Sequence, residues 1–310
     1  MAFALTVTTS YEGAAALLRH LGHPADDSTL HALAQRVGGR AQAQTEARLQ
    51  APPVEQTARR APSALGVLMM DGWQMRQRGP GWGKRQTKKA RVEWHEIKVG
   101  VFYLQEQAGR KNQRGGLAEK VVVSWQGEPV ELGRRLHLAA GEHGLARARR
   151  RLVISDGASW IWKLAQDRWA GSAELLDFYH ASQHVWSLGE AIHGDRQAAQ
   201  PWVESQLHQL RHGQELKVLR TFARLPVPAG EPGEIIRREQ NYFSGHAERL
   251  NYQAAARRGW PVGSGAVESA CLQRQGRFKR SGQFWTQPGQ QNLSALIEAR
   301  QNDHWDSLWN

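Results

Sequence analysis

Three acidic residues stand where an apolar run ends or where a helix can begin, and they constrain this chain more than any other feature. Asp71 and Asp156 each follow an apolar run, and Glu268 follows a glycine-rich turn. Apolar runs of this length are typical of buried strands, so both aspartates are expected at strand ends. The segments concerned are Leu65–Met70, Leu152–Ser155 and Gly263–Gly265.

Carboxylates at such positions suit a site for divalent cations. Hard cations such as Mg²⁺ prefer carboxylate oxygens, and two ions about 4 Å apart can hold both sides of a phosphodiester. We therefore predict Asp71, Asp156 and Glu268 as catalytic residues and metal ligands. Each has a plainer interpretation: an Asp after a strand usually caps a turn, and a Glu in a first helical turn complements the helix dipole.

The composition favours a polyanionic partner. The 310 residues include 41 Lys and Arg against 29 Asp and Glu, a formal net charge of +12. Such an excess indicates nucleic acid first, with a basic housekeeping protein as the alternative. Cys271 is the only cysteine, which excludes an intramolecular disulfide and a cysteine-based zinc site. No apolar run approaches the roughly 20 residues of a membrane helix, and the start lacks a signal-peptide pattern, so we expect a cytoplasmic protein.

The order of predicted elements defines the expected fold class. Three strands are followed by helix, strand, helix and strand, the order of an RNase H-like α/β fold with a mixed five-stranded sheet flanked by helices. In this class the first and fourth strands are neighbours, which would bring Asp71 and Asp156 together. The predicted strands are 64–70, 94–104, 120–125, 151–155 and 174–178, and the main predicted helices are 131–150, 158–169, 266–278 and 290–301.

The domain organisation follows from the same pattern. Residues 181–259 read as an all-α insertion before the helix of Glu268, broken by Pro226, Pro228 and Pro232. Two short helices over 11–21 and 29–37, the second capped by Asp27 or Ser28, resemble a helix-turn-helix; we favour an ordinary helical hairpin. The proline-containing stretch 51–63 reads as a linker. We therefore expect a helical segment and linker over 1–63 and a catalytic domain over 64–310.

Two further clusters could take part in the chemistry. A basic stripe after Glu268 could bind DNA phosphates, although such a stripe can also be a solvated helix face. His180 and His184 are one helical turn apart, so with Asp177 they could form a zinc site, but two histidines are more often structural. Alternatively, Asp177 and His180 could orient a DNA strand or a metal-bound water. The basic residues are Arg274, Arg277, Lys279 and Arg280.

Several stretches, taken in order, resemble insertion-sequence DDE transposases of the Kra type and, more distantly, Mutator-like transposases. They are Met70-Asp71-Gly72, Ser155-Asp156-Gly157-Ala158, Asp177-Phe178-Tyr179-His180, Gly263-Ser264-Gly265-Ala266-Val267-Glu268-Ser269 and Arg277-Phe278-Lys279. The resemblance implies that Asp71, Asp156 and Glu268 form a catalytic triad that uses two ions of Mg²⁺ or Mn²⁺. It also implies that Asp177 and His180 match the Asp-x-x-His signature of Mutator-like enzymes. We predict that these two residues act from outside the metal's immediate ligands.

The resemblance further implies partners and a reaction. The partners would be DNA, both as terminal inverted repeats and as target, and further copies of the chain in a homo-oligomer associated with the nucleoid. The reaction would be metal-dependent strand cleavage followed by strand transfer. Two alternatives stay open: a structure-selective nuclease of the same fold, and a truncated or domesticated protein that binds DNA without catalysis. The short region before the first strand favours truncation, whereas the complete acidic triad favours an enzyme.

Overall fold

The computed structural model describes residues 1–51, 65–83, 92–105 and 117–310, which fall into two compact units. The first unit is formed from residues 1–105, 117–149 and 266–310, and the second, within the described residues, from Arg150–Gly265. This division differs from the predicted boundary at residue 63. The N-terminal helices belong to the first unit because they pack there on its C-terminal helix, while the predicted linker over 51–63 lies almost wholly outside the described residues.

The sheet is mixed, as predicted, and contains five strands in the order β3-β2-β1-β4-β5. In the first unit, β1 pairs with β2 and β2 with β3, both antiparallel, with Asp71 opposite Val99. In the second unit β4 and β5 are parallel, with Ile154 opposite Leu175. The bounds are β1 Leu65–Arg78, β2 Val92–Gln105, β3 Leu117–Trp125, β4 Arg150–Ser155 and β5 Ala173–Leu176.

Strand β1 is longer than its apolar run, which corrects the prediction that Asp71 ends it. Residues from Leu65 to Met70 are all buried, whereas beyond Asp71 buried and exposed residues alternate up to Arg78. The second half of β1 is therefore a strand with one covered face, held by pairing with the first half of β2. Asp71 lies in the middle of the strand, where the change occurs.

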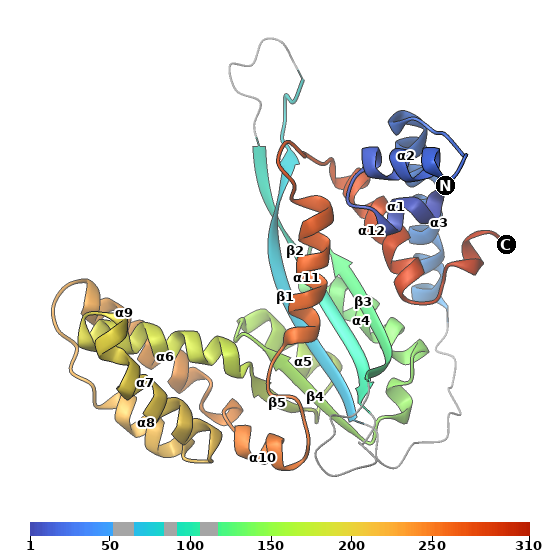
Figure 1. Ribbon diagram of the computed structural model, residues 1–310. Coiled ribbons are helices and arrows are strands. Elements are labelled where there is room, and N and C mark those ends of the chain that lie inside the picture. The colour runs from blue at the N-terminus through green and yellow to red at the C-terminus, as the bar shows by residue number, and fades with distance from the viewer. Residues whose placement is uncertain (52–64, 84–91, 106–116) are drawn as a thin grey trace. The chain divides into compact units, whose positions relative to one another are not determined.

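Helices cover the strands of the first unit. Figure 1 shows α11 running alongside β1 and β2 and α12 lying with the N-terminal helices. Asp26, rather than the predicted Asp27 or Ser28, caps α3 by accepting a hydrogen bond from the Thr29 amide at 2.7 Å. The helices are α1 Ala2–Val7, α2 Tyr11–His20, α3 Asp27–Gln50, α4 Pro129–Glu142, α11 Gly265–Phe278 and α12 Gln287–Gln301, with 3-10 turns Leu145–Arg147 and Asp306–Leu308.

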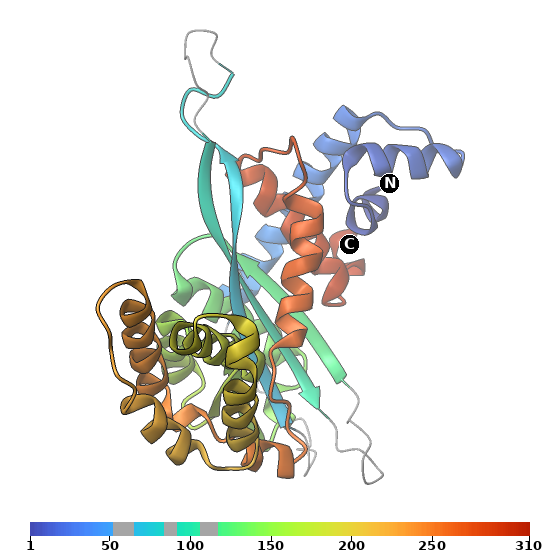
Figure 2. The same ribbon diagram turned by 60° about the vertical axis from the view of Figure 1, so that its left-hand side comes forward.

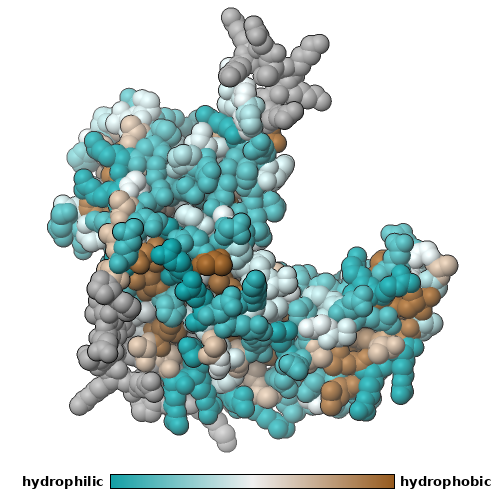
Figure 3. Space-filling view, turned by 180° about the vertical axis from the view of Figure 1, so that it is seen from behind, coloured by the Kyte–Doolittle hydropathy of each residue, from teal (hydrophilic) through white to brown (hydrophobic). Residues whose placement is uncertain are grey.

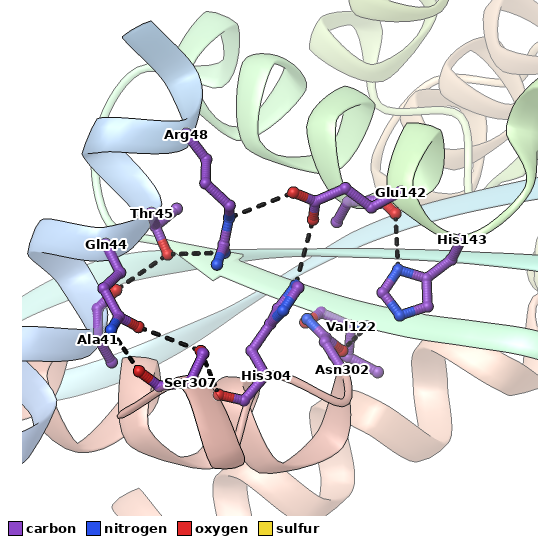
Figure 4. A network of polar contacts seen from close by, with 11 residues as sticks. Ala41, Gln44, Thr45, Arg48, Val122, Glu142, His143, Asn302, His304 and Ser307 are labelled. Carbon is purple, nitrogen blue, oxygen red and sulfur yellow. Dashed lines mark hydrogen bonds and ion pairs between the residues drawn. The ribbon is translucent and has the colours of Figure 1, made fainter. Parts of the chain in front are cut away.

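A polar network fixes the C-terminal segment of the first unit to α3, α4 and β3. In Figure 4, Glu142 lies between Arg48 at 3.2 Å and His304 at 3.1 Å. Asn302 donates to the Val122 carbonyl at 2.9 Å, and the Gln44 amide donates to the Ser307 carbonyl at 2.7 Å. The chain's two ends are thus packed into one core, which explains why the N-terminal helices do not form a separate unit.

The second unit contains β4, β5 and a group of helices. Residues from Phe178 onward are mainly helical, and the helices α6 to α9 lie together (Figure 2). The break between α8 and α9 falls at the predicted prolines Pro226 and Pro228. The bounds are α5 Ser159–Arg168, α6 Phe178–His193, α7 Arg196–Arg211, α8 Glu215–Ala223, α9 Glu231–Gly245, a 3-10 turn Ala247–Arg249 and α10 Tyr252–Arg257.

The surface agrees with the composition. On the face shown in Figure 3, hydrophilic residues cover most of the area, and hydrophobic residues appear in small separate areas. Within the described ranges, no helix is both long enough and apolar enough to cross a bilayer.

The contact between α3 and α12 gives a direct test of the packing in the first unit. A Cβ added at Gly38 would lie 2.1 Å from the Asn292 carbonyl oxygen, whereas one at Gly39 would lie 3.8 Å from the nearest atom, Oδ1 of Asn292. Gly38→Ala should therefore lower the free energy of unfolding by roughly 1–3 kcal/mol through overpacking. Gly39→Ala, the matched control, should raise it by up to about 1 kcal/mol because alanine favours the helix. Equal effects in denaturant titrations would contradict this packing.

Candidate active site

Asp71 lies on the face of β1 that α11 covers. Side chains alternate between the faces of a strand, so Asp71 shares a face with the buried residues Trp73 and Met75. The ring centroid of Trp73 lies 6.5 Å from that of Phe278, the last residue of α11. Asp71 is half-buried and its Oδ1 accepts a hydrogen bond from the Gly72 amide at 2.6 Å. Its carboxylate therefore lies at the partly exposed edge of the contact between β1 and α11.

Cys271 joins Asp71 to α11. Burial raises the pKa of the Cys271 thiol most, and the charge of Asp71 and a hydrogen bond with Asp71 raise it further, with a smaller effect from Glu268. A hydrogen bond that raises a thiol's pKa stabilises the protonated form, so the S–H donates to the carboxylate. Glu268 is exposed in the first turn of α11, one turn before Cys271. Asp71 and Glu268, two predicted metal ligands that are distant in sequence, thus both affect this buried thiol, Asp71 through a hydrogen bond and Glu268 through its charge.

Asp156, in the second unit, follows β4 directly, as predicted. Its Oδ1 accepts hydrogen bonds from the Ser155 hydroxyl and the Ala158 amide, each at 3.0 Å. Gly157 has a φ of +110°, a conformation that L-residues with a side chain rarely adopt. This turn separates β4 from α5, and it leaves the half-buried carboxylate at the strand's carboxyl end.

Two side chains from α9 and its C-cap hold the turn after Asp156. The Tyr242 hydroxyl donates to the Asp156 carbonyl at 2.7 Å. A Cβ at Gly157 would lie 2.9 Å from Nε2 of His246 and 3.0 Å from the Tyr242 ring, so only glycine fits beneath these rings. Burial lowers the pKa of His246, as does the charge of Arg249, while the charge of Asp156 and a hydrogen bond with the Gly157 backbone oppose this. We call Tyr242 and His246 the turn clamp.

The turn clamp was not predicted from the sequence. The only available signal was the spacing of Tyr242 and His246, four residues apart, which puts both on one side of a helix end. Burial raises the pKa of Tyr242, and the charges of Asp156, Asp177 and Glu239 add to this effect. The phenol is therefore a hydrogen-bond donor held within an acidic environment.

Asp177 is fully buried and fixes two backbone segments of the second unit. Its Oδ1 accepts from the His180 amide at 2.6 Å, which caps α6. Its Oδ2 accepts from the Ser264 hydroxyl at 2.5 Å and from the Ser264 amide. The Phe178 amide also donates to the Val262 carbonyl at 2.9 Å. Asp177 therefore anchors the turn that leads into α11.

The ring of His180 belongs to the aromatic group that includes Tyr242. Its ring centroid lies 5.0 Å from that of His184 and 6.5 Å from that of Tyr242. His184 stacks on Tyr242 at 3.7 Å, and its Nδ1 lies 2.5 Å from Oε2 of the buried Glu239. His180 is thus one ring away from the residue that contacts the Asp156 backbone.

The same contacts give His184 and Asp177 partners other than a zinc ion. His184 is paired with Glu239, and Asp177 holds Ser264. Among the residues that the structure describes, no group of three or more His, Cys, Asp or Glu is arranged to hold a metal ion, and this covers Asp71, Cys271 and Glu268 as well as Asp177, His180 and His184. These contacts do not support the zinc alternative for Asp177, His180 and His184.

The four basic residues after Glu268 do not form one exposed stripe. Arg274 and Arg277 are only 3% and 4% exposed, whereas Lys279 and Arg280 are exposed beyond the end of α11. Arg274 donates to Gln301 at 2.9 Å and lies 3.6 Å from Glu298, both on α12. The helix has no solvated basic face at Arg274 and Arg277 because it is packed there against α12 and the N-terminal segment.

Arg277 illustrates that packing. Its guanidinium lies 5.0 Å from the Tyr11 ring and 5.4 Å from the Trp285 ring, and it donates to the Thr9 carbonyl at 3.3 Å. Burial lowers the pKa of Arg277 to about 10. Arg274 and Arg277 therefore stabilise the first unit, which leaves Lys279 and Arg280 as the exposed basic residues of this group.

The donor set around Cys271 fits a hard cation better than a soft one. Asp71 and Glu268 offer carboxylate oxygens, which suit Mg²⁺ and Mn²⁺. A thiol binds metal as the thiolate, and the raised pKa of Cys271 keeps it protonated. The donor atoms that Asp71 and Glu268 could offer a metal are therefore carboxylate oxygens.

Comparisons with known proteins add one distant likeness. No protein-family model matches the chain, and no curated protein matches it. Among solved structures, a chain of the Drosophila P element transposase strand transfer complex is similar, with 12% identity and a TM-score of 0.30 over 99% of this chain and 78% of that one. A TM-score of this size does not establish a common fold.

The turn clamp can be tested by removing one hydroxyl. Tyr242→Phe keeps the ring but leaves the Asp156 carbonyl without this donor, so the free energy of unfolding should fall by about 0.5–1.5 kcal/mol. Hydrogen exchange at the amides of Gly157 and Ala158 should become faster. Tyr252→Phe is the matched control, because the Tyr252 hydroxyl is buried without a hydrogen-bond partner among the described residues. Faster exchange at this turn in both variants, or in neither, would contradict the clamp.

Proposed function

We propose that this protein is a DDE transposase of the Kra insertion-sequence type. It would cleave DNA at the terminal inverted repeats of its element and join the freed 3′ ends to target DNA. The observation that carries the proposal is the hydrogen bond between Asp71 of β1 and Cys271 of α11, the helix whose first turn contains Glu268. The position of Asp156 directly after β4 and the order of the strands support it further.

The proposed chemistry assigns a role to each carboxylate. Asp71, Asp156 and Glu268 would hold two Mg²⁺ or Mn²⁺ ions, which supply activation of the attacking oxygen and neutralisation of the leaving oxygen. Asp71 would present its carboxylate from a paired strand and Glu268 from a packed helix, so neither needs to be ordered on binding DNA. The Ser155 hydroxyl and the Ala158 amide would orient the Asp156 carboxylate.

The same residues would serve a structure-selective nuclease, which stops after cleavage. The test that separates the two supplies a 3′-hydroxyl end of the element and a circular target, and looks for joined product. A non-catalytic DNA-binding protein would give neither cleaved nor joined DNA. The presence of three carboxylates, where repulsion from phosphates would weaken simple DNA binding, favours an enzyme.

The triad variants test the central assignment. Asp71→Ala, Asp156→Ala and Glu268→Ala should each abolish Mg²⁺- or Mn²⁺-dependent cleavage of element-end DNA, because each removes oxygen ligands. Asp167→Ala, at an exposed position in the last turn of α5, should leave cleavage unchanged. Circular dichroism should show all four variants folded. Wild-type cleavage in any triad variant would remove that residue from the site.

His180 should support the reaction without binding the metal ions directly. His180→Ala should lower the cleavage rate roughly 10- to 100-fold without abolishing it, as expected of a residue that supports a ligand. The dependence of the rate on Mn²⁺ concentration should keep its form. His193→Ala, at the other end of α6, is the control and should behave as the wild type. A His180→Ala rate equal to wild type would exclude His180 from the site.

A further inference from the structure

A surface rich in cations and aromatic rings lies in the first unit, at the end of the β1–β2 pair away from Asp71. We call it the Trp94 surface. Trp94 stands opposite Arg76 across the two strands, and the segment after α11 lies against the same end. The surface consists of Arg76, Arg78, Trp82, Trp94, Lys279, Arg280 and Phe284.

Backbone contacts hold the segment after α11 in this position. The Arg78 amide donates to the Trp285 carbonyl at 2.8 Å, and the Arg78 side chain donates to the Phe284 carbonyl at 3.0 Å. The Arg76 guanidinium donates to the Arg280 carbonyl at 2.9 Å. These hydrogen bonds therefore hold the segment after α11 in a defined position against β1.

The cations of the surface contact rings instead of carboxylates. Arg76 lies 5.2 Å from the Phe284 ring, Arg78 lies 5.8 Å from the Trp82 ring, and Lys279 lies 5.9 Å from the Trp94 ring. In the described part of the chain, none of Arg76, Arg78, Lys279 and Arg280 forms an ion pair with an acidic side chain. Their positive charge is therefore available to an external anion.

Trp94 gives the surface a second character. Trp94 is 56% exposed, although tryptophan is usually well buried. An exposed indole beside unneutralised cations offers both a stacking partner for a base and charge for the adjoining phosphates. An acidic protein surface would satisfy the cations but would not explain the exposed ring.

We propose that the Trp94 surface binds single-stranded DNA, with Trp94 stacked on an unpaired base and Lys279 and Arg280 at phosphates. The proposal rests on the proposed function for the identity of the polyanion as DNA. Arg76 and Arg78 lie five and seven residues beyond Asp71 on β1, which corresponds to about 17–24 Å along the strand. At about 3.4 Å per nucleotide, the surface would hold DNA roughly five to seven nucleotides from the bond that is cleaved.

Binding of labelled oligonucleotides to the full chain tests this, measured by fluorescence anisotropy without divalent metal over a series of KCl concentrations. The probes are a blunt element-end duplex and the same duplex with a ten-nucleotide single-stranded flank. The wild type should prefer the flanked probe. Trp94→Ala should weaken binding of the flanked probe by roughly fivefold or more and remove the preference. Trp309→Ala, which changes an indole that is 48% exposed elsewhere in the unit, is the control.

The cations are tested separately. Lys279→Gln combined with Arg280→Gln should reduce the slope of log affinity against log salt by about 1.4 for the single-stranded flank. Arg19→Gln combined with Arg36→Gln removes the same charge from exposed positions outside the surface and should leave the slope unchanged. Equal effects in both double variants, or an unaltered preference in Trp94→Ala, would overturn the proposal. If the Lys279→Gln, Arg280→Gln double variant bound an acidic polypeptide such as polyglutamate more weakly but bound DNA as the wild type does, the proposal would also be overturned.

The binding result and the proposed function fail in different ways. Loss of flank binding in Trp94→Ala, in a protein that never cleaves DNA, would support the surface and reject the transposase. If cleavage depends on Asp71 but Trp94→Ala binds the flanked probe as the wild type does, the result would support the transposase and reject the Trp94 surface as a DNA-binding site.

Discussion

The packing of α11 against β1 is the interaction on which the candidate site depends. Glu268 lies in the first turn of α11, so its carboxylate approaches Asp71 only if the rest of the helix is held. The contact of Phe278 with Trp73 holds one end of α11, and the hydrogen bond between the Cys271 thiol and Asp71 holds its middle. Arg274 adds a buried ion pair to Glu298 of α12. These contacts bury apolar rings and paired polar groups together. A shift of the helix along β1 would therefore expose the apolar rings to water and leave the buried polar groups without their partners.

The same packing brings two negative charges close to one thiol. The charge of the Arg274 guanidinium lowers the pKa of Cys271, but this guanidinium is buried and paired with Glu298 of α12. In the proposed function, a divalent cation would supply countercharge to Asp71 and Glu268. In the second unit, the turn clamp and Asp177 use neutral donors to hold their acceptors. There, hydrogen bonds from Tyr242 and Ser264 replace countercharge.

Local patterns predicted the elements better than their ends. The apolar run Leu65–Met70 correctly indicated β1, but the strand continues through polar residues because its pairing with β2 and one covered face suffice to hold it. Helix α3 extends to Gln50, beyond the predicted end near Val37, because Gly38 permits the close approach of α12. Neither extension leaves a signal in local hydrophobicity.

Long-range contacts of the site could not be predicted from the sequence. The first turn of α11 and the end of β4 were predicted at the right residues, since a glycine-rich turn and an apolar run mark them. The contact of Tyr242 with the Asp156 backbone and the burial of Arg277 against Tyr11 join segments far apart in the chain. From the sequence alone, a basic residue on a helix is predicted to face solvent. Only the tertiary structure shows that Arg274 is paired with a residue of α12.

Cleavage of the protein backbone by bound Fe²⁺ tests the central claim most directly. Fe²⁺ replaces Mg²⁺ at oxygen-donor sites, and with ascorbate and peroxide it generates hydroxyl radicals that cut the nearest peptide bonds. If the three carboxylates form one site, the fragments should end near Asp71, Asp156 and Glu268. These fragments should disappear when Mg²⁺ competes and should be lost together in Asp71→Ala. Cuts confined to the neighbourhood of His180 and His184, or cuts near Asp71 and Glu268 with none near Asp156, would contradict a single site formed by the three carboxylates.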